Sequence, residues 1–175
     1  ASPHRAAGST RPATPPRDPN TPGPMTDFEI RPTATPPRDL LLLADEYDAS
    51  VDDYIHRGVC YVARRGDETL GEYILLHTRP FTAEIVNLAV APDHQRQGIA
   101  TALIAHAART ARRAGLRRLE IGTGNSGLGQ LALYERCGFR RTGIDRDYFR
   151  RYYPQPIFEN GIECRHMVRL EMELP

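Results

Sequence analysis

Three glycines between residues 122 and 127 have the spacing of a phosphate-binding turn. The sequence LEIGTGNSG places them as Gly-x-Gly-x-x-Gly behind a strand-like run, and a helical pattern follows. Asp145 and Asp147 lie about twenty residues further on, where a dinucleotide-binding turn has an acidic side chain for the ribose. Taken alone, the motif indicates a bound dinucleotide.

The same stretch resembles the cofactor motif of class I S-adenosylmethionine-dependent methyltransferases. Both interpretations require several further strand–helix units after the motif. Only 48 residues follow Gly127, and their pattern predicts two strands and no further helix. We therefore interpret the glycines as a tight strand-to-helix turn with Ser126 as the helix N-cap, and a methyltransferase remains the alternative.

A second candidate anion site lies earlier, in QRQGIA at residues 95–100. A predicted strand ends at Val90, and Gly98 and Ala100 are small where the chain turns into a long helix. The first N–H groups of a helix have no partner within it, and the helix dipole favours an anion there. This stretch has no Lys-Ser/Thr pair, so it is not the loop of P-loop NTPases, and we predict a pyrophosphate site.

The run from residue 84 to 107, EIVNLAVAPDHQRQGIATALIAHA, resembles the acetyl-coenzyme A signature of the GNAT superfamily of N-acetyltransferases. The resemblance continues through GNSGLGQLALYERCGF at residues 124–139, with an Asn in the loop and a Tyr before a Gly-Phe pair. It implies a mixed α/β fold with a central sheet of about six to seven strands, splayed between the fourth and fifth, and about four helices. Acetyl-coenzyme A is then the co-substrate, and no metal is needed.

The resemblance also implies which residues hold the co-substrate. The backbone of Leu88, Ala89 and Val90 would bind the pantetheine arm like an added strand, with Val90 N–H polarising the thioester carbonyl. Asn125 would reach the arm from the neighbouring strand. The pyrophosphate would be wrapped by Gln95, Arg96, Gln97, Gly98, Ile99 and Ala100.

Two residues are candidates for proton transfer. Glu84 lies in an otherwise apolar strand, where a carboxylate can have a raised pKa suited to a general base, and the resemblance places a catalytic glutamate there. Ordered water is the alternative base, and Glu84 could instead face solvent or pair with arginine. Tyr134 matches the general-acid tyrosine of the family, and packing of its ring on its helix is compatible with that role.

The acceptor site implied by the resemblance is formed by the first two helices and the loop before the last strand. Acidic side chains there suit an ammonium-bearing acceptor, such as a polyamine, an aminoglycoside-like polycation or a protein amine. An ordinary solvated surface is the alternative. The acidic residues are Glu46, Asp48, Asp52, Asp53, Asp145, Asp147, Glu159 and Glu163.

The elements that position these residues follow from the apolar pattern. The helix predicted at 99–114 repeats its apolar residues every four positions, and a second helix at 50–58 would have Ser50 as its N-cap. Further helices are predicted at 37–47 and 126–138. Strands are predicted at 28–31, 59–65, 69–79, 82–90, 116–123, 139–149 and 166–174.

Composition fits one domain. The chain has 175 residues and a net charge of +1, which argues against nucleic acid or an anionic membrane as a partner. We expect a Pro-rich tail at 1–24, non-native or flexible, and a catalytic domain at 25–175. Three scattered cysteines predict neither disulfides nor a metal site, and we expect a cytoplasmic protein, with a homodimer left open. A GNAT-fold module that senses acyl-coenzyme A without catalysis is the non-enzymatic alternative.

Overall fold

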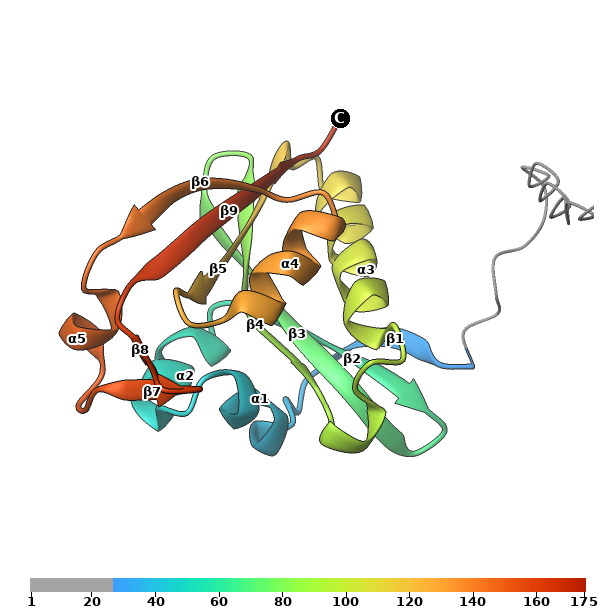
Figure 1. Ribbon diagram of the computed structural model, residues 1–175. Helices are drawn as coiled ribbons and strands as arrows, with labels where there is room; N and C mark the ends of the chain where they lie inside the picture. The colour runs from blue at the N-terminus through green and yellow to red at the C-terminus, as the bar shows by residue number, and fades with distance from the viewer. Residues whose placement is uncertain (1–26) are drawn as a thin grey trace, which may run out of the picture.

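A single seven-stranded sheet organises the chain, in the order β1-β2-β3-β4-β5-β9-β6 (Figure 1). The computed structural model describes residues 27–175, so the predicted tail at 1–24 lies outside the described residues. Strands β4 and β5 run parallel, and the other neighbouring pairs are antiparallel. The strands are β1 (Glu29–Thr33), β2 (Val59–Arg65), β3 (Glu68–Arg79), β4 (Thr82–Val90), β5 (Arg118–Gly124), β6 (Arg140–Asp145) and β9 (Met167–Glu173).

Five α-helices and one two-stranded hairpin complete the described part of the chain. The hairpin pairs β7 with β8 and lies beside α5 and α2 in Figure 1. A 3-10 turn, η1 (Pro92–His94), precedes α3. The bounds are α1 (Arg38–Ala44), α2 (Asp48–Ile55), α3 (Ile99–Arg113), α4 (Leu128–Arg136), α5 (Tyr148–Tyr152), β7 (Ile157–Glu159) and β8 (Ile162–Cys164).

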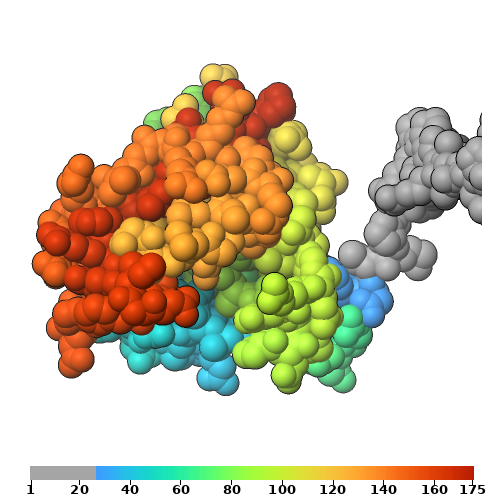
Figure 2. Space-filling view, viewed as in Figure 1, coloured from blue at the N-terminus to red at the C-terminus, as the bar shows by residue number. Residues whose placement is uncertain are grey.

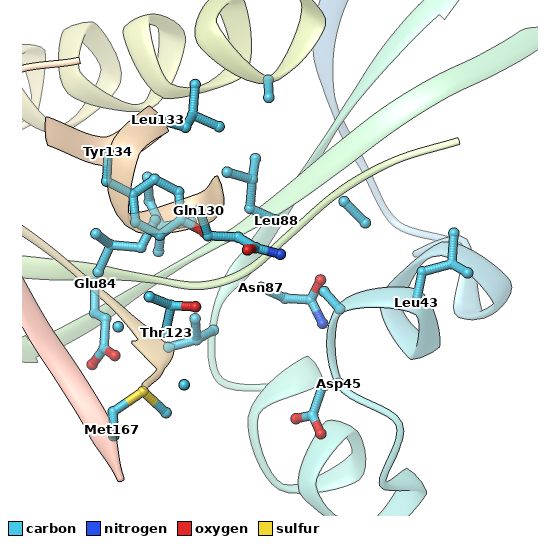
Figure 3. Close-up of a pocket in the computed structure, with 18 of the residues that line it drawn as sticks. Leu43, Asp45, Glu84, Asn87, Leu88, Thr123, Gln130, Leu133, Tyr134 and Met167 are labelled. Atoms are coloured by element: carbon cyan, nitrogen blue, oxygen red, sulfur yellow. The ribbon is translucent and has the colours of Figure 1, made fainter. Parts of the chain in front are cut away.

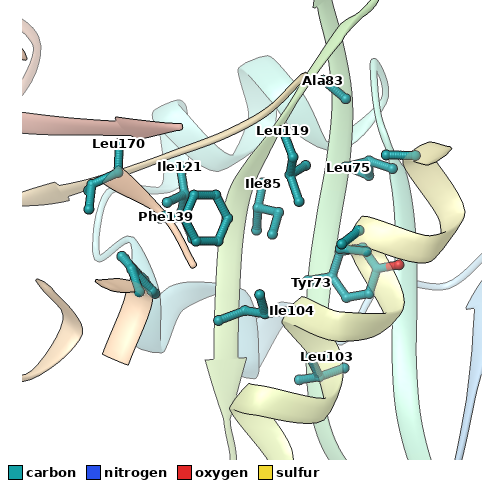
Figure 4. Close-up of a cluster of buried hydrophobic side chains, with 14 of the residues drawn as sticks. Tyr73, Leu75, Ala83, Ile85, Leu103, Ile104, Leu119, Ile121, Phe139 and Leu170 are labelled. Atoms are coloured by element: carbon teal, nitrogen blue, oxygen red, sulfur yellow. The ribbon is translucent and has the colours of Figure 1, made fainter. Parts of the chain in front are cut away.

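The two faces of the sheet are covered by different helices. Side chains alternate along a strand, so Tyr73 and Leu75 of β3 join the core beneath α3 and α4 (Figure 4). Ile74 and Leu76 join the core beneath α1 and α2. The predicted four-residue stripe of α3 is buried in the first core. The predicted mixed fold is confirmed.

A gap opens between the two parallel strands. Their pairing ends at Ile85 and Ile121, while β5 continues its pairing with β9 as far as Gly124. On its other edge, β4 shifts register against β3, because Ile74 faces Asn87 but Leu75 faces Ile85. The extra residue, Val86, is a β-bulge, which bends and twists its strand. The predicted splay between the fourth and fifth strands is confirmed.

Several local predictions were wrong. Neither serine is an N-cap: Ser50 lies within α2 and its hydroxyl donates to Asp45 (2.7 Å), and the hydroxyl of Ser126 donates to Glu159 (2.5 Å). The strand predicted at 139–149 ends at Asp145, and its last two residues instead begin α5. The rest of α5 and the β7–β8 hairpin follow where no element was expected. These short elements matter because they form one wall of the site.

Candidate active site

A cavity of about 1090 Å³ occupies the gap between β4 and β5. Its wall includes the C-terminal half of β4, the start of α3, the end of β5 and one side of α4, and it is completed by α1, α2 and α5. In the space-filling view, the surface is hollowed where α4, α1 and the residues before α3 meet (Figure 2). Of the twelve predicted site residues, all but Gln97 and Asn125 line this cavity.

One end of the cavity has the geometry of an anion site. The loop before α3 contains two residues with left-handed backbone, Arg96 (φ 61°) and Gly98 (φ 84°), and α3 begins directly at Ile99 without a side-chain cap. The first amides of α3 are therefore free to bind an anion. Gln97 is not among the lining residues, and its side-chain amide donates to the carbonyl oxygen of Asp93 (3.4 Å).

The end of β4 presents two peptide groups to the gap. Ala91 N–H donates to Leu70 O of β3 (2.8 Å), and hydrogen-bonding residues alternate along an antiparallel pair. The peptide group of Ala89 therefore faces β3, whereas those of Leu88 and Val90 face the gap. The carbonyl oxygen of Val90 accepts a hydrogen bond from the Gln95 side chain (3.1 Å). The Val90 N–H remains available to a bound group.

Glu84 lies on the wall of the cavity, with 20% of its side chain exposed (Figure 3). Arg169 of β9 donates a hydrogen bond from Nη1 to Oε1 of this carboxylate, at 2.9 Å. Burial raises the pKa of Glu84 above its ordinary value, the charge of Arg169 opposes that rise, and Glu120 adds to it. The result is a partly buried carboxylate with a raised proton affinity.

Tyr134 of α4 lies on the same cavity wall as Leu133 and Gln130 (Figure 3). Only 6% of the residue is exposed, and its ring packs against Phe139 with the centroids 6.2 Å apart. Burial raises the pKa of the phenol to about 12. Its hydroxyl is therefore protonated near neutral pH and can donate a proton.

Asn125 is bonded to the chain just before β9. Its Oδ1 accepts hydrogen bonds from the backbone N–H groups of Arg165 and His166, both at 2.8 Å. Its Nδ2 donates to the carbonyl oxygen of Glu163 at 3.0 Å. Both ends of the side-chain amide are thus used to join the end of β5 to the segment that leads into β9.

The glycine motif is explained by close packing. A Cβ atom at Gly122 would lie 2.7 Å from Met167 Sδ, and one at Gly127 would lie 2.7 Å from Thr123 Oγ1. At Gly124 it would overlap Cys164 Sγ. The interpretation as a tight turn between strand and helix is confirmed. Asp145 and Asp147, the candidate ribose ligands, pair instead with Arg151 and Arg165.

The acidic residues predicted around the acceptor divide into two groups. Glu46, Asp53 and Glu159 line the cavity. The other five are not among the lining residues and form ion pairs with arginines, so the prediction that they line the site was wrong. Those residues are Asp48 and Asp52, both paired with Arg38, Asp145 with Arg151, Asp147 with Arg165, and Glu163 with Arg150.

Sequence reasoning missed a carboxylate between α1 and α2. Asp45 lines the cavity and accepts hydrogen bonds from the hydroxyls of Ser50 (2.7 Å), Tyr54 (3.2 Å) and Tyr153 (2.8 Å). Tyr153 lies 108 residues away in the chain, so no local pattern signals this contact. Arg169 was missed for the same reason, because its contact with Glu84 spans 85 residues.

No three His, Cys, Asp or Glu side chains within residues 27–175 are grouped in a way that could hold a metal ion. Within the same residues, no helix is long and apolar enough to span a bilayer.

A family model and a similar protein both indicate the same family for this chain. Residues 27–139 match the acetyltransferase (GNAT) family. The chain is 53% identical over 136 residues to the uncharacterised N-acetyltransferase YvbK of Bacillus subtilis, an alignment that covers 78% of this chain and 88% of that protein.

Two solved structures share the fold along nearly their whole length. An acetyltransferase of Bacillus subtilis in complex with CoA has 48% identity and a TM-score of 0.80, and a GNAT acetyltransferase of Elizabethkingia anophelis with acetyl-CoA bound has 44% and 0.82. Each match covers 85% of this chain and 99% of the other. The methyltransferase alternative finds no support, since the glycines on which it rested are explained by packing. The chain belongs to the GNAT family of acetyltransferases.

Proposed function

We propose that the protein transfers the acetyl group of acetyl-coenzyme A directly to a primary amine of a cationic acceptor. The acceptor class is a small polyamine or aminoglycoside-like molecule, or a protein amine. The main support for this proposal is that one cavity has a helix N-terminus at one end and both Glu84 and Tyr134 on its wall. Both similar solved structures, which contain CoA or acetyl-CoA, support this donor.

The residues of the chain have distinct parts in this transfer. Acetyl-coenzyme A supplies an activated acetyl thioester. The loop from Gln95 to Ala100 holds its pyrophosphate at the start of α3, and the peptide groups of Leu88 and Val90 hold its pantetheine arm. Val90 N–H donates to the thioester carbonyl and stabilises the negative charge that develops there, an effect typically worth about 3 kcal/mol.

Glu84 and Tyr134 move the protons. The acceptor attacks as the neutral amine, since an ammonium has no lone pair, and Glu84 accepts the proton that the nitrogen loses, directly or through a water molecule. A carbon–nitrogen bond forms as the carbon–sulfur bond breaks, and the sulfur leaves as a thiolate. Tyr134 gives its proton to that thiolate. The products are an acetamide and the free thiol of coenzyme A.

Charge along the cavity supports a cationic acceptor. Arg96 and Arg136 line the part near α3 and α4, where a polyanionic donor would lie. In the part formed by α1, α2 and the hairpin, Asp45, Glu46 and Glu159 have no arginine within ion-pair distance among the described residues. An ammonium group is the natural counter-ion for that end.

The test measures release of coenzyme A thiol with acetyl-coenzyme A and a panel of primary amines. We expect turnover that needs both substrates together, with sequential kinetics. Glu84→Gln should lower kcat about a hundredfold at neutral pH. Glu171→Gln, a substitution on β9 away from the cavity, is the matched control and should leave kcat unchanged. A thermal shift with acetyl-coenzyme A but no thiol release across the panel would support the non-catalytic sensor instead.

A further inference from the structure

Arg169 crosses a neighbouring strand to reach the candidate base. It lies on β9 opposite Gly122 of β5, and Glu84 lies on β4 on the other side of β5. Strands two apart in a sheet are separated by about 10 Å, so only a long side chain can cover that distance. Its Nη1 nevertheless lies 2.9 Å from Oε1 of Glu84.

Gly122 leaves the space for this crossing. A Cβ atom at residue 122 would lie 3.3 Å from Nη1 of Arg169, closer than such contacts normally come. The first glycine of the GTGNSG stretch therefore leaves room where the arginine passes over the strand. Gly122 thus contributes to the site by making space for Arg169, and not by binding a phosphate group.

Two further groups hold the guanidinium. The ring of Tyr148 lies under it, with the guanidinium carbon 5.4 Å from the ring centroid. Asp145 of β6 lies 3.9 Å from Nη2. Both contacts favour a cation at this position, and both leave Nη1 directed at Glu84.

The other charged groups around Glu84 do not replace Arg169. Glu120 faces Glu84 across the β4–β5 pair, and Arg79 of β3 forms its ion pair with Glu120. On α5, Tyr148 is the titratable side chain that interacts electrostatically with Glu84. Burial, the largest effect, and Glu120 raise the pKa of Glu84, whereas Arg169 and the more distant Arg79 lower it. Arg169 is the cation in direct contact with the carboxylate.

We propose that Arg169 is a positioning residue that keeps the Glu84 carboxylate ionised and directed at the acceptor amine. This inference rests on the proposed function, in which Glu84 is the general base. Without its arginine, a carboxylate buried beside Glu120 would hold its proton to a higher pH, and a protonated carboxylate cannot accept one from the amine.

The test compares pH profiles of kcat/KM for the wild type and Arg169→Met, which keeps a long side chain without the charge. Loss of an adjacent cation typically raises a carboxyl pKa by about 1 to 3 units. We expect kcat/KM of Arg169→Met to be about tenfold to a hundredfold below wild type at pH 6, and to approach the wild-type value at about pH 9. A ratio that stays constant with pH would overturn the inference.

Three further variants make the result specific. Arg169→Lys restores a cation and should recover part of the activity at pH 6. Gly122→Ala, which crowds Nη1, should move the profile in the same direction as Arg169→Met but less far. Arg118→Met removes an arginine that pairs with Glu171 on the same sheet, and its profile should match the wild type. An identical shift in Arg118→Met would overturn the inference.

Failure of the inference and failure of the proposed function look different. If Glu84→Gln loses activity while Arg169→Met keeps a constant ratio to wild type, Glu84 remains the base and Arg169 does not tune it. If Glu84→Gln keeps full activity at every pH, the base itself is wrongly assigned. Thermal melting of each variant shows whether a loss of activity reflects unfolding.

Discussion

The side-chain amide of Asn87 donates a hydrogen bond to the hydroxyl of Tyr54, at 2.8 Å. Tyr54 donates in turn to Asp45, so β4 is joined through one tyrosine to the carboxylate between α1 and α2. A second Asn87 hydrogen bond reaches the carbonyl oxygen of Leu41 at 3.0 Å. The strand proposed to bind the acetyl donor therefore also fixes the helices proposed to bind the acceptor.

Asp45→Asn should weaken the binding of cationic acceptors. The substitution keeps the shape but removes a charge that three hydroxyl groups hold in place. We expect KM for acceptors with two ammonium groups to rise about tenfold, with a smaller change for matched monoamines and little change in kcat. Steady-state kinetics with diaminoalkanes and alkylamines of equal length measure the difference.

The control for this prediction is Asp48→Asn. Asp48 lies on α2 close to Asp45 in sequence, but it pairs with Arg38 and does not line the cavity. Its KM values should equal those of the wild type. Equal effects of Asp45→Asn on mono- and diamines would show that Asp45 does not bind the second ammonium group.

Tyr134→Phe should lower kcat without weakening the binding of acetyl-coenzyme A. The phenol is protonated at neutral pH because burial raises its pKa to about 12, and phenylalanine fills the same space without a proton to donate. We expect kcat to fall about a hundredfold, a magnitude typical of a lost general acid. Calorimetric titration with coenzyme A should give an affinity near that of the wild type. Unchanged turnover would leave Tyr134 a packing residue.

Gly124→Ala should destabilise the protein rather than act on a bound cofactor. The added methyl group would overlap Cys164 Sγ, and overpacking of this kind costs about 1–3 kcal/mol. Gly129→Ala is the matched control, because nothing lies within 4 Å of its Cβ position and alanine favours the helix. Urea unfolding of both variants should show a loss for the first and a small gain for the second.

Glu72 should make stability fall as the pH rises. This residue of β3 is fully buried, and one carboxylate oxygen has no hydrogen-bond partner among the described residues. Burial raises its pKa from 4.5 to about 8. Between these values the folded protein binds more protons at this site than the unfolded chain does, so the free energy of unfolding decreases with rising pH.

Glu72→Gln removes that dependence. The variant should equal the wild type near pH 4 and exceed it by roughly a few kcal/mol above pH 8, where the wild-type carboxyl must be ionised in an apolar site. Unfolding by urea at the two pH values gives the comparison. Glu173→Gln, at the exposed end of β9, should follow the wild type throughout. A parallel fall in stability for Glu72→Gln would assign the pH effect to another group.

The long central elements could be predicted from the sequence. The strand predicted at 82–90 is β4, and the helix predicted at 99–114 differs from α3 by one residue. Both elements are long enough for the spacing of their apolar residues to show whether they form a strand or a helix. In α3, for example, an apolar residue is buried on every turn. Eleven of the twelve candidate site residues lie on these two elements, on α4 or between β4 and α3, and ten of these eleven line the cavity.

The acceptor side could not be predicted in the same way. Helix α5 has five residues and the hairpin strands have three each, too few to show a period. Tertiary contacts also decided between the possible partners of polar residues. Ser50 and Ser126 could have capped helices, but Asp45 and Glu159 lie close enough to take their hydroxyls. A count of acidic residues cannot show which of them have an arginine beside them.

Part of the cavity wall lies outside the segment that matches the family. The family match ends at residue 139, and Tyr148, Tyr153 and Arg169 lie beyond it. The proposed donor end rests on β4 and α3, where peptide groups would bind the donor, whereas the proposed acceptor end consists largely of side chains, several of them on α5 and the β7–β8 hairpin. We therefore expect substitutions after residue 139 to alter which acceptor is used while leaving the proposed donor site intact. In evolutionary terms, the acceptor preference of such a chain can diverge without loss of its acetylation chemistry.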